Sequence, residues 1–136
     1  MRKLSILFLS IFVLFLVFFL WKKEEKNIQN ATAIYGTWHW KQSRGGTNGK
    51  EVITPEETGV DKKLVFNTNK KVTVFTNEVE TGNYTYRITK GNSIFDDKQH
   101  YLLTFNDMTY VIQSLDNKNL SILDNFAEGY VLTYTK

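Results

Sequence analysis

The sequence predicts an all-β fold, an eight-stranded antiparallel up-and-down barrel, preceded by one N-terminal transmembrane helix. Three observations lead to this prediction. An uncharged apolar run opens the chain, apolar and polar residues alternate over most of the remainder, and short turn sequences separate the alternating segments. Alternation at a period of two is typical of strands that bury one face, and short connections join antiparallel neighbours.

The first element is the apolar run of residues 4–21, LSILFLSIFVLFLVFFLW, which follows a basic start at residues 1–3. As a helix, this run is close to the thickness of a hydrocarbon core. A cleaved secretory signal has a shorter apolar region, followed closely by small residues at the cleavage site. The triplet Ala31-Thr32-Ala33 lies beyond a charged cluster at residues 22–26, too far from the apolar run. We therefore predict an uncleaved transmembrane signal anchor.

A charged and polar linker, residues 22–33, connects this anchor to the body at residues 34–136. Two basic residues precede the anchor and three lysines follow it. The positive charge on the two sides of the anchor is therefore nearly equal, and the positive-inside rule gives little preference for either orientation. The basic start is similar to a secretory n-region, and we therefore expect the body to lie outside the cytoplasm. Trp21 is expected to be an interfacial aromatic at the membrane edge, or alternatively to stand where a lipoprotein has its lipidated cysteine.

The body is electrically neutral. Five of the seventeen Lys and Arg residues and two of the fourteen acidic residues lie before residue 27, which leaves twelve of each sign in the body. Phosphate binding needs a concentrated basic face, so we do not expect a nucleic-acid partner. The sequence has no cysteine, which excludes disulfides, thiol catalysis and thiolate metal sites.

Eight alternating segments follow the linker, and turn residues separate nearly every pair. The predicted strands are residues 35–42, 62–67, 71–77, 82–89, 100–105, 109–115, 119–123 and 130–135. Eight such strands avoid exposed sheet edges most simply by closing into a barrel. A two-sheet sandwich is the alternative.

One face of each strand is predicted to line the interior. The predicted interior side chains are Trp38, Trp40, Leu64, Phe66, Val72, Val74, Tyr84, Tyr86, Ile88, Tyr101, Leu103, Phe105, Tyr110, Ile112, Leu120, Ile122, Tyr130, Leu132 and Tyr134. The opposite face is mostly polar, which fixes the register of the strands. Five apolar residues break the alternation and are expected to pack beneath a loop or a partner. They are Val65, Phe75, Leu102, Val111 and Val131.

The longest connection is residues 43–61, which is rich in glycine and lies between the first two predicted strands. Long loops at the mouth of a barrel are uncommon unless they act as lids or binding segments. A tolerated surface excursion is the alternative interpretation.

Catalytic or metal-binding residues in a recognisable arrangement are not found. His39 and His100 are far apart and have no paired ligand at metal spacing. The adjacent carboxylates Glu56-Glu57 and Asp96-Asp97 are expected to be solvated turn residues. We therefore expect no cofactor, no metal and no enzymatic activity.

The body resembles a known family at several motifs. These are Gly36-Thr37-Trp38-His39-Trp40, residues 43–46, Thr54-Pro55 to Gly59, Leu64-Val65-Phe66, and Leu123-Asp124 to Gly129-Tyr130. Together they resemble the small lipocalin-like domains of Bacteroidota envelope proteins, over the body from about residue 34 to the end. The resemblance implies an exported, membrane-associated barrel able to hold a small apolar molecule. It also implies that Gly36 and Trp38 close the barrel beneath a basic side chain of the last strand, where this sequence offers no arginine and only Lys136.

Two function hypotheses remain open at this point. In the first, a single-pass, cell-membrane protein of the bacterial envelope binds a small hydrophobic molecule inside a lipocalin-like barrel on the periplasmic side. The side chains predicted to line its cavity are Trp40, Phe66, Tyr84, Tyr86, Tyr101, Tyr110 and Tyr130. In the second, these side chains fill the barrel, and the surface together with residues 43–61 binds a protein partner. An envelope enzyme is the least supported class.

Overall fold

The computed structural model describes residues 31–136 of the chain, and the compact unit formed by Ala33–Lys136 contains all of the strands. The predicted anchor at residues 4–21 and most of the predicted linker lie outside the described residues. Within residues 31–136, none of the helices has the length and apolar character needed to cross a membrane.

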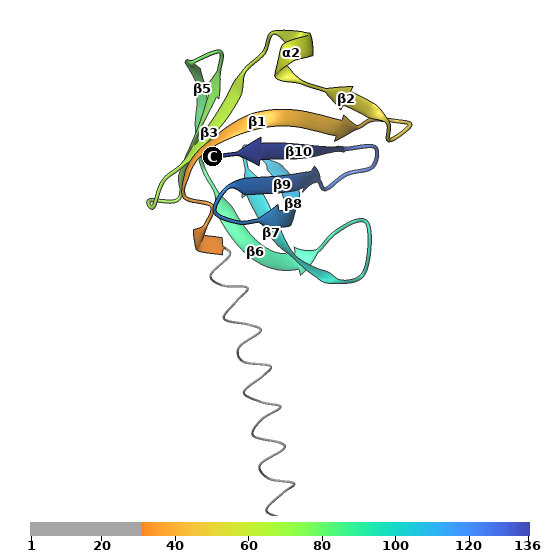
Figure 1. Ribbon diagram of the computed structural model, residues 1–136. Coiled ribbons are helices and arrows are strands. Elements are labelled where there is room, and N and C mark those ends of the chain that lie inside the picture. Colours follow the sequence, from red (N-terminus) through yellow and green to blue (C-terminus); the bar gives the residue numbers. More distant parts are fainter. Residues whose placement is uncertain (1–30) are drawn as a thin grey trace, which may run out of the picture. The chain divides into compact units, whose positions relative to one another are not determined.

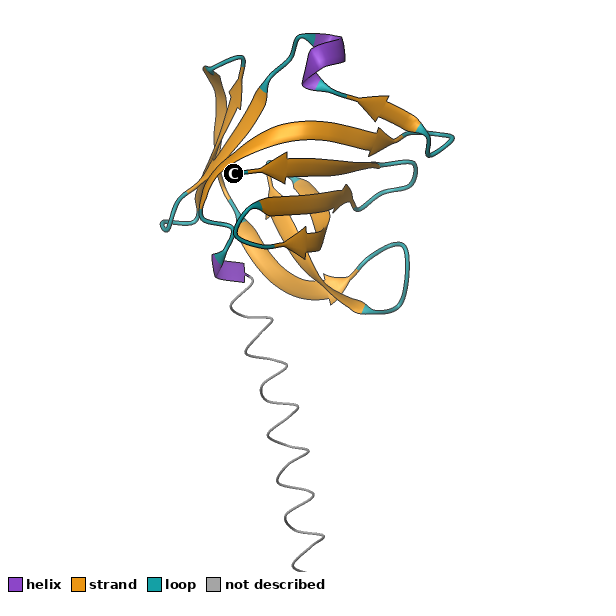
Figure 2. Cartoon of the chain, viewed as in Figure 1, coloured by secondary structure: helices purple, strands orange, loops and turns teal. Residues whose placement is uncertain are grey.

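Residues 31–136 form ten strands and include the short helix α2 (Pro55–Thr58), as Figures 1 and 2 show. The strands are β1 (Gly36–Gly45), β2 (Glu51–Ile53), β3 (Lys62–Phe66), β4 (Lys71–Thr76), β5 (Val79–Thr85), β6 (Arg87–Asn92), β7 (Gln99–Phe105), β8 (Met108–Leu115), β9 (Asn119–Asp124) and β10 (Tyr130–Thr135). The prediction of an all-β fold is confirmed for this part of the chain.

Nine of these strands form one antiparallel sheet in the order β5-β4-β3-β1-β10-β9-β8-β7-β6, and β2 pairs with β1 outside this path. The first and last strands are neighbours, with His39 opposite Thr135 and Gly45 opposite Tyr130. The two strands at the ends of the order, β5 and β6, are consecutive in the chain and separated only by Tyr86. The sheet is therefore curled into an antiparallel half-barrel, and two separate packed sheets are not formed by the described residues.

The structure has two strands more than the predicted eight, because the predicted strand at residues 82–89 is two strands and because β2 forms within the predicted loop at residues 43–61. The first part of residues 82–89, in β5, pairs with β4, whereas β6 pairs with β7. At the break, the backbone N–H of Tyr86 donates to the carbonyl of Lys70 at 2.9 Å. Alternation continues through such a change of partner, because it reports only which side chains face the interior.

The segment at residues 43–61 is more ordered than the predicted loop. It contains the end of β1, all of β2 and the helix α2, which the sequence pattern did not predict. The Thr54 side chain caps this helix by accepting from the N–H of Glu57 at 3.3 Å, Pro55 begins it, and Gly59 ends it in the left-handed conformation. A single capped turn is too short to show an amphipathic period.

The register of β1 contains a bulge between Trp40 and Gln42, opposite β10. A bulge inserts one residue and re-aims the side chains that follow it. As a result Ser43 is buried on the same side as Trp40, although strict alternation would turn it outward.

Candidate functional site

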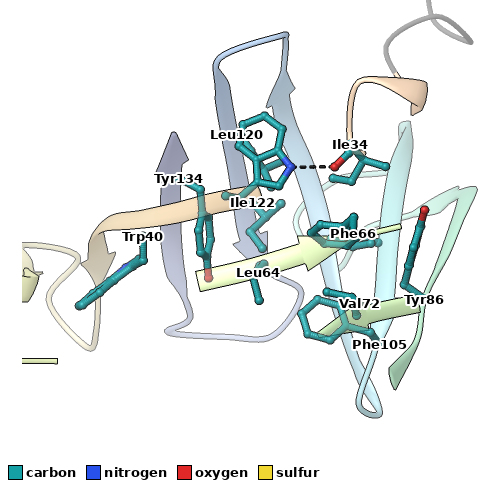
Figure 3. Close-up of a cluster of buried hydrophobic side chains, with 12 residues drawn as sticks. Ile34, Trp40, Leu64, Phe66, Val72, Tyr86, Phe105, Leu120, Ile122 and Tyr134 are labelled. Carbon is teal, nitrogen blue, oxygen red and sulfur yellow. Dashed lines mark hydrogen bonds between the residues drawn. The ribbon is translucent and has the colours of Figure 1, made fainter. Parts of the chain in front are cut away.

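The interior of the half-barrel, where a ligand site was predicted, contains a continuous cluster of apolar side chains (Figure 3). Its buried members are Ile34, Trp38, Trp40, Leu64, Phe66, Val72, Tyr86, Leu103, Phe105, Leu120, Ile122 and Tyr134. Of these, Trp38, Val72, Leu103 and Leu120 have 0% exposed surface. A side chain with no exposed surface borders no space that admits a water molecule, so this part of the interior is closely packed.

Trp38 is a fully buried member of the cluster. Its indole N–H donates to the carbonyl of Ile34 at 2.7 Å, and the ammonium of Lys136 lies 4.7 Å from the ring centroid. The same ammonium donates to the carbonyl of Ala33 at 3.0 Å. Lys136, the residue that follows β10, thus covers the indole ring of Trp38. A cation over an indole face is attracted by the ring quadrupole.

Because Gly36 has no side chain, the side chain of Lys136 can lie directly beside it. Its φ of +119° is a conformation that side-chain-bearing residues rarely adopt, and a Cβ at this position would lie 3.2 Å from Cε of Lys136. In the Gly-x-Trp motif, the glycine therefore leaves room for the lysine side chain, and the tryptophan provides the ring that the lysine covers.

Trp40, two residues further along β1, has a parallel set of contacts at another part of the cluster. Its indole N–H donates to Oγ of Ser43 at 3.1 Å, and the ammonium of Lys62 lies 4.9 Å from its ring. Both inward tryptophans are thus satisfied in hydrogen bonding and covered by a lysine. Trp40 therefore presents no unpaired polar atom to a ligand.

The aromatic rings in the interior contact one another. Phe66 meets Tyr86 edge-on at a centroid distance of 5.0 Å, and Phe105 stacks on Tyr110 at 5.4 Å. Phe105 also lies 6.3 Å from Phe66 and 6.4 Å from Tyr84. These spacings fall in the range of favourable aromatic pairs, so Phe105 joins two groups of rings across the interior.

Five of the seven residues predicted to line a cavity lie in or against this cluster, namely Trp40, Phe66, Tyr84, Tyr86 and Tyr110. The remaining two do not. The hydroxyl of Tyr130 donates to Oε2 of Glu51 in β2, at 2.5 Å, and the ring of Tyr101 lies beneath Lys90 at 5.4 Å. Sequence reasoning left Phe105 and Tyr134 out of the site, although alternation had turned both inward.

Burial favours the neutral form of three tyrosines of the interior, Tyr86, Tyr110 and Tyr134. Burial raises the pKa of Tyr86 to about 12, and burial also raises the pKa of Tyr134 and of Tyr110. The hydroxyl of Tyr86 donates to the carbonyl of Asn67 at 3.2 Å. Neutral phenols of high pKa can donate hydrogen bonds but are poor bases, so the interior is suited to packing and not to proton transfer.

The outer face of the sheet carries a second apolar group. Val131 lies opposite Leu123, Leu123 opposite Val111, and Val111 opposite Leu102, so the row crosses β10, β9, β8 and β7. Val111 is only 4% exposed although its neighbours Tyr110 and Ile112 face the interior. Three of the five residues that broke the alternation, Val131, Val111 and Leu102, belong to this row.

The segment at residues 93–98, between β6 and β7, covers part of this row. Between the segment and the sheet is a hollow of about 380 Å³, which we term the wall hollow. It is lined by Ser93, Phe95, Asp96, His100, Val111, Ile112, Gln113 and Leu123. Covering by residues 93–98 explains why Val111 is buried on the outside of the sheet.

Comparisons of the chain with protein-family models, with curated proteins and with solved structures gave no match. The function must therefore be inferred from the residues and their geometry.

The wall hollow contains a histidine and an acid in direct contact. Nε2 of His100 lies 2.7 Å from Oδ1 of Asp96. The hydrogen bond from His100 holds the pKa of the Asp96 carboxyl below its usual range, and the N–H of Lys98 adds to this effect. Ser93 also lines the hollow, but its Oγ accepts from the N–H of Phe95 at 3.2 Å. Within residues 31–136, no hydrogen bond joins Ser93 to His100, and no cluster of three or more His, Asp or Glu side chains could hold a metal.

Proposed function

We propose that the chain is a non-enzymatic binding domain of the lipocalin-like type, anchored by residues 4–21 and held on the periplasmic side of a bacterial cell membrane. In this proposal the half-barrel is a filled scaffold, and binding takes place on its outer surface. The observation that carries the proposal is the packing of the interior, where Trp38, Val72, Leu103 and Leu120 have no exposed surface.

A small molecule bound in the interior would need volume that the aromatic side chains already occupy. A pocket for a small molecule needs roughly 300 Å³ or more, whereas the interior rings already contact one another at centroid distances of 5.0 to 6.4 Å. Opening a cavity of that size would separate these rings and expose buried apolar surface. Each large side chain displaced in this way costs about 2–3 kcal/mol, which a small ligand would have to offset.

The segment at residues 43–61 provides an ordered outer surface. The bond from Tyr130 to Glu51 ties it to β10, and the cap of α2 fixes the chain beyond β2. A second hollow of about 380 Å³ is lined by Thr47, Asn48, Lys50 and Glu51. A surface that is already ordered loses little conformational entropy on binding a partner, which supports a role for this segment in recognition.

A small apolar ligand inside the half-barrel is the second candidate, and one observation favours it. The hydroxyl of Tyr101 is buried and has no hydrogen-bond partner in the described part of the chain. A buried polar atom without a partner calls for an explanation, such as a bound molecule. Tyr84 and Tyr110, which are half-buried, are rings packed against the cluster that such a ligand could contact.

Native mass spectrometry of the full chain, released from gentle detergent, separates the two candidates. The filled scaffold predicts a mass equal to that of the polypeptide alone. A co-purified small molecule that is lost from the variant Tyr101→Phe, and kept by the outer-face variant Val65→Ala, would instead establish the interior site and contradict the filled scaffold.

A further inference from the structure

We propose that the wall hollow, on the outer face of β7, β8 and β9, binds a small neutral apolar molecule that carries one hydrogen-bond acceptor. The inference rests on the proposed function in one respect only, that binding takes place on the outside of the half-barrel. It adds the class of ligand that this face of the sheet would bind.

The floor of the hollow is apolar where the pattern of the strand would make it polar. Val111 and Leu123 are cross-strand partners on adjacent strands and both line the hollow. Outward positions on a half-barrel are normally solvated, and apolar residues there need a cover. The cover in this case leaves a space of about 380 Å³ and does not pack flat against the floor.

The cover, residues 93–98, is held at two points. The N–H of Ile94 donates to Oδ1 of Asn125 at 3.0 Å, and the pair between Asp96 and His100 ties the other part of the segment to β7. The N–H of Lys98 donates to Oδ1 of Asp96 at 3.0 Å, which further fixes the turn. A cover fixed at two points keeps the hollow open without a ligand, and such preorganisation lowers the cost of binding.

Phe95, which lines the hollow, belongs to a group of exposed apolar side chains on neighbouring loops. Ile94, Phe95 and Phe126 are 57%, 48% and 45% exposed, and the bond from Ile94 to Asn125 places two of the loops that carry them side by side. Neighbouring exposed apolar side chains of this size are typical of binding sites. An apolar molecule seated against Phe95 would remove part of this surface from water.

The polar groups of the hollow define the remaining chemistry of the ligand. Oδ1 of Asp96 already accepts from His100 and from the N–H of Lys98, and the carboxylate repels an anion, so a neutral ligand is favoured over an anion. Oε1 of Gln113 accepts from Oγ of Ser121 at 3.3 Å, which leaves the amide nitrogen of Gln113 as a donor. The hollow therefore matches an apolar molecule with one acceptor, such as a carbonyl oxygen.

The test uses the full chain in lipid nanodiscs, with ¹³C-labelled Val and Leu methyl groups observed by NMR. Acetophenone is the probe, because it is neutral, aromatic and has one carbonyl, and ethylbenzene is its match without the acceptor. We expect saturable shifts of the Val111 and Leu123 methyls, with acetophenone binding several-fold more tightly than ethylbenzene. In Gln113→Leu, the difference between the two probes should disappear.

Two variants decide the location of the site. Val111→Trp fills the hollow and should weaken binding at least tenfold, while Val65→Trp, on the outer face of β3, should leave it unchanged. Should Val111→Trp fail to fold, Phe95→Ala removes the aromatic ring that the cover contributes to the hollow. This variant should weaken acetophenone binding several-fold. Equal affinity in Phe95→Ala and the native chain, or shifts that do not saturate, would overturn the inference.

The same spectra separate this inference from the proposed function. Shifts at neither set of methyls would overturn the wall hollow as a site and leave the filled scaffold intact. Shifts confined to the interior methyls of Leu103 and Leu120 would contradict both, because a probe would then have entered the half-barrel.

Discussion

The ammonium of Lys136 lies 4.7 Å from the ring centroid of Trp38 and donates to the carbonyl of Ala33 at 3.0 Å. This contact joins the last residue of the chain to the first strand, beside the pairing of β1 with β10. The two ends of the half-barrel sequence are thereby fixed to each other at one end of the apolar cluster.

Replacing Lys136 by alanine should destabilise the fold by about 1–2 kcal/mol, because a cation–π contact and a hydrogen bond, both at an exposed side chain, are lost. Lys136→Arg should retain most of this stability. Urea unfolding monitored by tryptophan fluorescence measures the change, with the exposed Lys50→Ala as the control. Equal stability of Lys136→Ala and Lys50→Ala would show that the contact contributes nothing.

Gly36→Ala should cost about 1–3 kcal/mol, because a φ of +119° is strained for alanine and the new methyl would press on Lys136. The matched control is Gly49→Ala, which also has a positive φ but where an added methyl would meet nothing within 4 Å. We expect the Gly36 variant to lose more stability than the Gly49 variant. In combination with Lys136→Ala, the cost of Gly36→Ala should fall; simple additivity would contradict the contact.

Alkaline pH should destabilise the fold through Tyr86. Its pKa is raised by burial from 10.0 to about 12 in the folded state, so between these values the unfolded chain loses a proton that the folded chain keeps. The stability due to the neutral phenol is therefore fully present below pH 10 and is lost as pH rises toward 12. Tyr86→Phe should show a shallower loss of stability over this range in urea unfolding at stepped pH. An identical pH profile for the variant and the native chain would refute the shift.

The predicted anchor is tested separately, in cells. The mature chain isolated from membranes should begin upstream of Trp21, and added protease should digest the body in spheroplasts but not in intact cells. A mature N-terminus near Thr32 or Ile34 would establish cleavage. Protection of the body in spheroplasts would reverse the proposed orientation.

The sequence was sufficient for the fold class because alternation of side chains reports directly on which face is buried. The inward positions of Trp38, Leu103 and Ile122, for example, follow from period two alone and are buried in the structure. The turn Asn106-Asp107, which lies between the predicted strands 100–105 and 109–115, joins β7 and β8, with both residues at positive φ.

Sequence reasoning missed the positions at which a strand changes its pairing partner and those at which a bulge shifts the alternation by one residue. Tyr86 lies between two strands with different partners, and the bulge near Trp40 turns Ser43 inward. The position of Val111 depends on residues 93–98 folding over the sheet, which is a tertiary contact. A change of pairing partner and a bulge leave no periodic signal. The break in alternation at Val111 indicated a covering loop or partner but not the segment that supplies it, so the wall hollow could not have been found from the pattern of the strands.

The most direct test of the filled scaffold is a crystal structure of the full chain at a resolution that reveals ordered water. The proposal predicts that the space bounded by Trp38, Phe66 and Phe105 contains only side-chain density. An interior cavity of roughly 300 Å³ or more, holding density for a bound molecule beside Tyr101, would contradict it.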